Sequence, residues 1–126
     1  MNKLYIAVLD DAPDYIVPTL VAHAVLGAHL VFTEAYYKQD ECYQYMTWLT
    51  DSFRKVVVKV NQKEFDKISA LPNTYLGHES TILEGRKSCA IPLPCSDEER
   101  PNVLKFAKKW APKKDMNIEK TTTIDN

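Results

Sequence analysis

The 126-residue chain has little glycine, few cysteines and almost no net charge. Its three glycines are scattered, so there is no Gly-rich phosphate-binding loop and no nucleotide-binding fingerprint. The three cysteines are odd in number and follow no C-x-x-C spacing, which predicts free thiols rather than a disulfide framework. A formal net charge of -1 gives no overall attraction to nucleic acid, so such binding would need a local basic patch.

Signals for secretion, metal binding and membrane insertion are also missing. No charged leader precedes an apolar segment with a cleavage site, so we expect a cytoplasmic protein. The three histidines have no ligand spacing that matches the cysteines, so neither a metal nor another cofactor is expected. The longest uncharged segment reads as about four helical turns, shorter than the roughly 20 apolar residues that span a bilayer, so no membrane contact is expected.

The segment from Pro18 to Phe32 is the element around which the rest of the chain is predicted to be organised. Its apolar residues recur at a helical spacing, and no charge interrupts it. We expect a buried helix that lies across a sheet, with the small residues Ala24 and Ala28 in close contact with the strands. Of the two histidines on this helix, His23 is expected in the core with a hydrogen bond and His29 at the surface.

The remaining pattern alternates strands and helices. Strands are predicted at 3–9, 54–60, 74–76 and 88–93, with Pro92 confining the last one to an edge or a bulge. Further helices are predicted from about 40 to 51, behind an Asn61–Glu64 capping box, and around 103–110 with Phe106 and Trp110 buried. This order predicts a compact three-layer α/β/α domain over residues 1–112 with a four-stranded mixed sheet, and a polar, disordered tail over 113–126.

A polar loop before the fourth predicted strand holds the candidate catalytic residues. The imidazole of His78 can act as a base near neutral pH, the carboxylate of Glu79 can orient it, and the hydroxyl of Ser88 can bind the reacting group. Ser80 and Thr81 are candidate binding residues in the same loop. These residue types are also typical of an ordinary solvent-exposed turn.

Two further groups of charged residues are candidate binding sites. Asp10 and Asp11, followed by Asp14, come directly after the first strand and are candidates for binding a metal or for acid–base roles, although an Asp-rich turn is the more common explanation. Basic residues gather in sequence at 54–67 and at 105–114, and the second group contains the three expected phosphate contacts Lys105, Lys108 and Lys109. These lysines form a footprint for a phosphate backbone if they share one face, and a solvated surface if they do not.

Aromatic residues gather around the second predicted helix. Tyr45 and Trp48 fit a buried helical stripe, whereas Tyr36, Tyr37 and Tyr43 are the expected anchors if the protein binds a partner or forms a homodimer.

Several segments, in this order, resemble the type 2 peptidyl-tRNA hydrolase superfamily over about residues 3 to 110. The predicted strands 3–9 and 54–60, the second with a helix after it, fit the family's order. Residues 22–29 are similar to the family's His-Ala-x-x-Gly-Ala helix. Residues 88–94 are similar to its strand that ends in proline. The resemblance implies a compact α/β sandwich with a site beside the first helix and the loop before the fourth strand.

The chain departs from this family at the residues that carry its chemistry. Tyr15 and Ile16 stand where active members have a Gly-Lys pair, and residues 76–81 contain no aspartate in register with the family's Asp-Ala-Gly-x-Thr loop. Only Ser88, at a position where the family has threonine, keeps the expected type of group.

The resemblance and its departures imply a divergent, non-catalytic protein that binds tRNA or a protein of the translation machinery, similar to a small accessory protein encoded by a phage. One alternative is hydrolysis of peptidyl-tRNA by a rebuilt site that uses His78, Glu79 and Ser88. Another is an oligomeric protein-interaction module.

Overall fold

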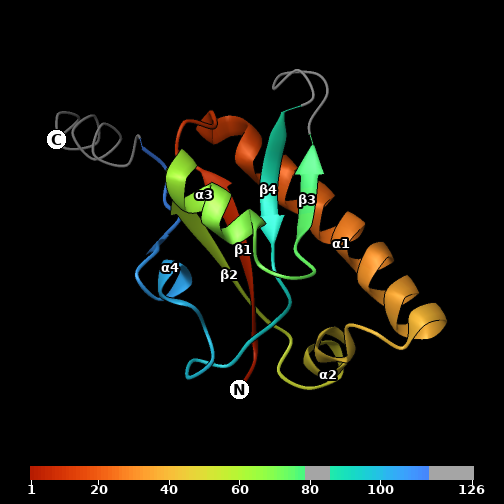
Figure 1. The fold of residues 1–126 in the computed structure, drawn as a ribbon. Coiled ribbons are helices and arrows are strands. Elements are labelled where there is room, and N and C mark those ends of the chain that lie inside the picture. Colours follow the sequence, from red (N-terminus) through yellow and green to blue (C-terminus); the bar gives the residue numbers. More distant parts are fainter. Residues whose placement is uncertain (79–85, 114–126) are drawn as a thin grey trace, which may run out of the picture.

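The computed structural model describes residues 1–78 and 86–113, in which helices pack on both faces of a mixed sheet (Figure 1). The strands are β1 (Lys3–Leu9), β2 (Arg54–Val60), β3 (Tyr75–His78), β4 (Lys87–Ile91) and β5 (Lys108–Lys109). The helices are η1 (Asp14–Ile16), α1 (Val17–Gln39), α2 (Tyr43–Thr50), α3 (Gln62–Ser69) and α4 (Asn102–Lys105). The predicted α/β class is confirmed, but the described sheet has five strands instead of four. Beyond Lys113, the predicted disordered tail lies outside the described residues.

The strand directions bring the C-terminal ends of three strands to the same end of the sheet. The strand order is β3-β4-β1-β2-β5, with β1 and β2 parallel and every other neighbouring pair antiparallel. Strands β1, β2 and β3 therefore end, and β4 begins, at one end of the sheet, which we call the carboxyl edge. Just before this edge a single row of residues crosses all five strands, namely Gly77, Cys89, Val8, Lys59 and Lys108.

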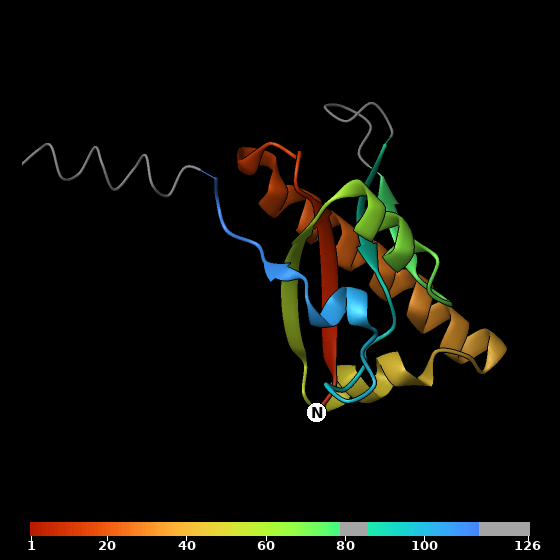
Figure 2. The ribbon, with the colours of Figure 1, turned by 60° about the vertical axis from the view of Figure 1, so that its left-hand side comes forward.

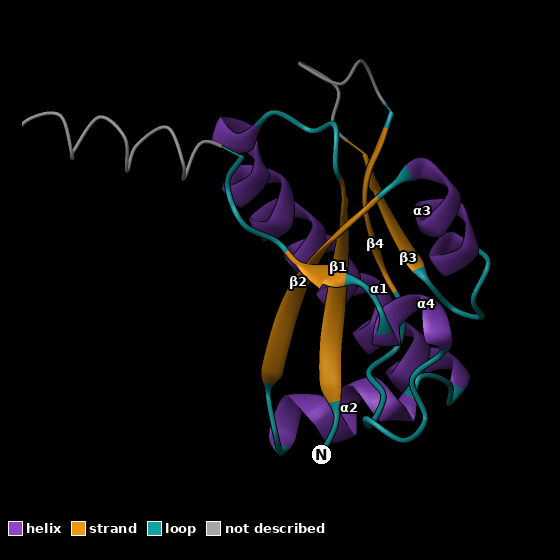
Figure 3. Cartoon of the chain, turned by 90° about the vertical axis from the view of Figure 1, so that its left-hand side faces the viewer, coloured by secondary structure: helices purple, strands orange, loops and turns teal. Residues whose placement is uncertain are grey.

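Strand β1 is buried on both faces and separates two hydrophobic clusters. Side chains alternate along a strand, so one set (Leu4, Ile6 and Val8) packs toward α1 and α2, while the other set packs toward α3 and α4. Figure 2 shows α1 on one side of the sheet and α3 and α4 on the other. Helix α2 lies near the ends at which β1 and β2 begin (Figure 3).

Helix α1 is longer than predicted, because it continues from Val17 to Gln39 and ends at Asp40, which is left-handed with φ 55°. Contrary to the sequence-based expectation, its region is long and apolar enough to cross a membrane by length and composition. Its inner face nevertheless packs on the sheet, since Ala24 and Ala28 are fully buried as predicted. A Cβ placed on Gly77 would lie only 3.2 Å from the Cβ of Ala24, so the small residues allow a close approach of helix and sheet.

The prediction for the two histidines of α1 was wrong. His23 is exposed, whereas His29 is half-buried and forms a hydrogen bond with Tyr45. Neighbouring residues on a helix point about 100° apart, so burial of Ala24 and Ala28 turns His23 away from the sheet. The same geometry turns His29 toward α2, which the sequence did not place.

Short-range predictions around α3 and β4 had different outcomes. The capping box of α3 is confirmed, because Asn61 Oδ1 accepts from the Glu64 N–H at 2.8 Å and Glu64 Oε1 accepts from the Asn61 N–H at 2.9 Å. Pro92 does not confine β4 to an edge, since β4 lies between β3 and β1 and ends at Ile91, directly before the proline.

The prediction of a last amphipathic helix around residues 103–110 was also wrong. Helix α4 is only four residues long, Phe106 is 73% exposed, and the chain then pairs with β2 as β5. The Trp110 N–H extends this pairing by donating to the Val57 carbonyl at 2.9 Å. The open edge of β2 has backbone groups that need hydrogen-bond partners, and this requirement outweighs the helical spacing of the side chains.

Candidate functional site at the carboxyl edge

The carboxyl edge brings together Asp10, Asp11 and His78, which the sequence marks as candidates, and two further cations. Asp10 and Asp11 follow β1, His78 ends β3, and Arg86 and Lys87 lie where β4 begins. In open α/β sheets, ligands bind outside the carboxyl ends of the strands, so this edge is the natural place for a site. The predicted site residues Glu79, Ser80 and Thr81 lie outside the described residues.

A hollow of about 360 Å³ lies at this edge on the α3 face, lined by Leu9, Gln62, Phe65, His78, Arg86 and Lys87. Leu9 and Phe65 are buried and give it an apolar floor, while the three basic side chains are exposed around it. The side-chain amide nitrogen of Gln62 donates to Asp66 Oδ1 at 2.8 Å. An apolar floor with a few convergent polar groups is typical of ligand sites, and the volume lies near the lower end of their usual range.

Sequence reasoning identified His78 but missed Gln62, Arg86 and Lys87. The sequence feature that could have indicated the two cations was the adjacent pair Arg86 and Lys87, between the polar loop and the fourth predicted strand. Their position beside Leu9 and Phe65 depends on the pairing of β4 with β1, which is a tertiary contact.

The acidic residues near the hollow have two different roles. Arg86 Nη1 lies 3.9 Å from Asp11 Oδ2, and both side chains are more than half exposed, so this ion pair is weak. Asp14 instead holds the C-terminal segment in place, because its Oδ2 accepts from the Lys113 backbone N–H at 2.6 Å. Its other oxygen, Oδ1, is buried with no hydrogen-bond partner among the described residues. Asp10 and Asp11 are therefore the exposed carboxylates of this edge.

His78 and Ser88 lie on opposite faces of the sheet. The register between β3 and β4 shifts between Gly77 and His78, and such a bulge directs two consecutive side chains to one face. Ser88 is 2% exposed, and its Oγ lies 3.2 Å from the position that a Cβ on Gly77 would occupy, beside Ala24 of α1. His78 lines the hollow on the α3 face. The described residues thus do not bring this imidazole and this hydroxyl together.

The only described thiol beside Ser88 is not suited to nucleophilic chemistry. Burial raises the pKa of the Cys89 thiol to about 12, and a hydrogen bond with the Ser88 side chain lowers the pKa by a smaller amount. Because the thiolate is the reactive form, Cys89 is chemically inert at neutral pH. All three cysteines are free, as predicted, and Cys89 is fully buried.

The start of α1 has an apolar residue, Ile16, where the resemblance to peptidyl-tRNA hydrolases would imply a lysine. Ile16 is 8% exposed and belongs to the core on the α1 face, while Tyr15 is 75% exposed. The apolar side chain therefore takes part in the packing of α1 and offers no group that binds a phosphate or polarises an ester.

The lysines predicted as phosphate contacts do not share one face. Lys105 is in α4, whereas Lys108 and Lys109 are consecutive in β5 and point to opposite faces of the sheet. Lys108 lies directly opposite Lys59 on β2, and Lys59 Nζ donates to the Ala111 carbonyl at 2.6 Å. These contacts beside β2 and β5 are thus separate from the hollow near β3 and β4.

No group of three His, Cys, Asp or Glu side chains within residues 1–78 and 86–113 is arranged to hold a metal ion. No protein-family model matches the sequence, and no curated protein matches it.

Proposed function

We propose that this protein binds RNA, specifically a tRNA end, at the carboxyl edge and does not hydrolyse the ester bond of peptidyl-tRNA. The observation that carries this proposal is the hollow in which Arg86, Lys87 and His78 surround the apolar floor of Leu9 and Phe65. Arginine and lysine bind phosphate oxygens, and an apolar floor accepts a base or a sugar from a single strand.

The charges of the hollow favour an anionic ligand. Arg86 has only a long ion pair to Asp11, and the exposed Lys87 side chain lies next to it in the sequence. A phosphate that replaces the long contact to Asp11 would gain a shorter, charge-assisted hydrogen bond.

Two features support binding over catalysis. The position of the family's lysine is occupied by Ile16, which is packed in the core. The candidate base His78 and the candidate hydroxyl Ser88 lie on opposite faces of the sheet. A hydrolase would need a base or polarising group and an oxyanion-stabilising group within reach of one carbonyl.

The binding test uses deacylated tRNA and an Arg86→Ala/Lys87→Ala double variant. We expect the wild type to bind with a salt-dependent affinity, and the variant to bind more weakly with a salt slope reduced by about 2, one per lost phosphate contact. The matched control is Lys38→Ala/Lys67→Ala, which removes two exposed lysines on α1 and α3 and should leave binding unchanged. Binding that is absent at low salt, or equal in both double variants, would contradict the proposal.

The catalytic alternative is tested by incubating the protein with peptidyl-tRNA and following the release of free tRNA. We expect a rate equal to that in buffer. Release above the buffer rate that is lost in His78→Ala would instead support the hydrolase.

A further inference from the structure

The outward face of α1 carries a row of six residues, five of them exposed and one half-buried. We call this row the outer seam, and it consists of Thr19, His23, Leu26, Leu30, Thr33 and Tyr37. Leu26 is 67%, Leu30 is 69% and Tyr37 is 74% exposed, which is unusual for large apolar residues on one helix. The seam runs for about 27 Å at 1.5 Å per residue.

The outer seam has the spacing of a row along one helix face, and the a and d positions of paired helices use the same spacing. Its residues follow one another at intervals that alternate strictly between four and three, the a and d positions of a heptad repeat. The inner face of α1, with Ala24 and Ala28, has a separate row and packs on the sheet. The two faces therefore belong to different contacts.

We propose that the outer seam pairs antiparallel with the outer seam of a second copy of this chain, forming a two-fold symmetric dimer. The six positions are symmetric about residue 28, so one antiparallel register matches every residue of the seam. Leu26 then lies opposite Leu30 of the second copy, His23 opposite its Thr33, and Thr19 opposite its Tyr37. Apolar residues meet apolar residues, and each polar side chain meets a hydrogen-bonding partner.

The hollow beside the outer seam also fits a second copy of α1. Between α1 and α2 lies a hollow of about 780 Å³, walled by the C-terminal half of the seam and by Met46 and Leu49 of α2. In the antiparallel register this hollow receives the N-terminal half of the second α1, and symmetry fills the equivalent hollow of the other copy.

A lipid surface fits the seam less well. Helices that lie on membranes carry lysine and arginine along a polar face that flanks the apolar one, whereas α1 has a single basic residue, Lys38, near its C-terminal end. Burial in lipid would also leave Thr19, His23 and Thr33 without hydrogen-bond partners outside the helix. The dimer is independent of the RNA-binding function proposed above, since the hollow at the carboxyl edge shares no residue with the seam.

Sedimentation velocity from about 1 to 500 µM tests the dimer, a range in which modest interfaces associate. We expect a concentration-dependent monomer–dimer equilibrium that Leu26→Glu/Leu30→Glu weakens at least about tenfold, because four carboxylates would then meet at the two-fold axis. The matched control is Phe106→Glu, a similarly exposed apolar residue next to α4 on the other face of the sheet, which should leave the dimer unchanged. Circular dichroism should show both variants folded, since the substituted side chains are exposed.

Cysteine cross-linking tests the register in a Cys42→Ser/Cys95→Ser background. The double variant His23→Cys/Thr33→Cys should form a disulfide-linked dimer, while either single variant should not. A monomer at every concentration, a dimer unaffected by Leu26→Glu/Leu30→Glu, or a cross-link from His23→Cys alone would overturn the proposal. So would a monomer that co-sediments with phosphatidylcholine–phosphatidylglycerol vesicles through the seam leucines.

Discussion

His29 and Tyr45 connect α1 to α2, with His29 Nδ1 lying 2.8 Å from the phenolic oxygen of Tyr45. Tyr45 is only 2% exposed and also packs against Phe32 and Trp48, with ring centroids 5.1 Å and 5.2 Å away. The hydrogen bond therefore satisfies a polar group inside an aromatic cluster. It makes α2 part of the core on the α1 face.

We expect His29→Ala to lower the free energy of unfolding by about 1–2 kcal/mol, because a buried phenol would lose its partner. The matched control is His23→Ala on the exposed side of α1, which should change the free energy by no more than about 0.5 kcal/mol. Urea midpoints measure both variants. Equal midpoints would mean that the His29–Tyr45 bond contributes nothing measurable.

The close contact of α1 with β3 predicts that Ala24 cannot become larger. The Cβ of Ala24 faces Gly77, where even an added methyl group would lie at 3.2 Å, so Ala24→Leu should overpack this layer and cost about 1–3 kcal/mol. Ala22→Leu, on the exposed side of the same helix, is the control and should change stability by no more than about 0.5 kcal/mol. An Ala24→Leu variant as stable as this control would rule out the tight contact.

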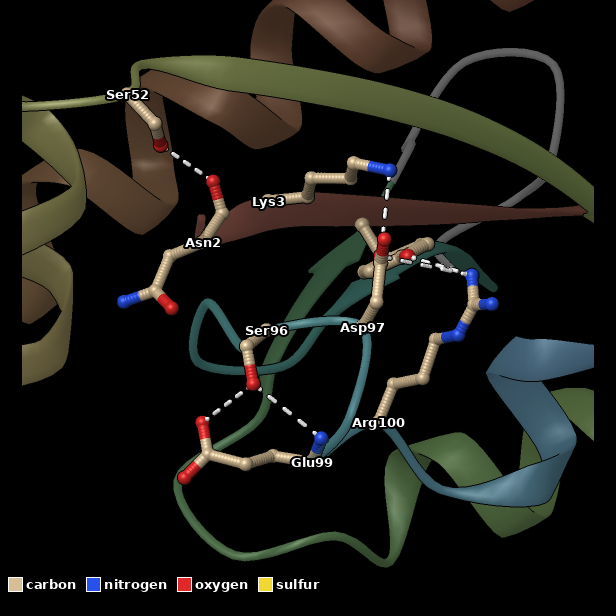
Figure 4. A network of polar contacts seen from close by, with 8 residues as sticks. Asn2, Lys3, Ser52, Ser96, Asp97, Glu99 and Arg100 are labelled. Atoms are coloured by element: carbon tan, nitrogen blue, oxygen red, sulfur yellow. Dashed lines mark hydrogen bonds and ion pairs between the residues drawn. The ribbon is translucent and has the colours of Figure 1, made fainter.

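A polar cluster at the start of β1 predicts an acid dependence of stability (Figure 4). Lys3 Nζ lies 3.2 Å from Asp97 Oδ1, and the hydrogen bond and charge of Lys3 lower the pKa of Asp97 below its usual 3.8. A lowered pKa contributes stability that is present above pH 3.8 and is lost as the pH falls through the folded-state pKa. Asp97→Asn should therefore flatten the decline of the urea midpoint below pH 3.8. An unchanged decline would show that Asp97 makes no such contribution.

Arg100 in the same cluster should contribute more to the stability of the fold near neutral pH than Asp97 does. Its Nη1 donates to the phenolic oxygen of Tyr5 at 3.1 Å, and Tyr5 is only 3% exposed. Arg100→Ala would leave this phenol without its partner, so we expect a larger drop in the urea midpoint than for Asp97→Asn. The reverse order would mean that the exposed ion pair outweighs the bond to Tyr5.

The raised pKa of Cys89 predicts both slow labelling and an alkaline loss of stability. At pH 8 the native protein should react with a thiol reagent at Cys89 far more slowly than at the partly exposed Cys95, as mass spectrometry of the labelled peptides can show. Since the folded-state pKa of about 12 exceeds the usual 9.0, the contribution of Cys89 to stability is complete below pH 9.0 and declines as the pH rises toward 12. Cys89→Ala should remove that part of the decline. Rapid labelling of native Cys89 would contradict its burial.

Local patterns in the sequence determined the elements whose cause is local. Strands β1 and β2 occur at the predicted residues because their apolar, β-branched segments are continuous, and α3 begins after Asn61 because the capping box needs only neighbouring residues. The sequence also predicted the buried row of Ala24 and Ala28, because small residues at helical spacing indicate the side of a helix that packs closely against a neighbour. These features hold whatever the rest of the chain does.

Tertiary structure decided the features whose cause is a distant partner. The segment near Phe106 and Trp110 has a helical spacing but forms β5, because the edge of β2 offers backbone hydrogen bonds. His29 is half-buried because α2 packs beside it. A bulge between β3 and β4 placed His78 and Ser88 on opposite faces, although the sequence suggested one site. The period of a sequence indicates which residues avoid water, but strand pairing decides which distant side chains meet, and so the hollow of Arg86, Lys87 and His78 exists only in the fold.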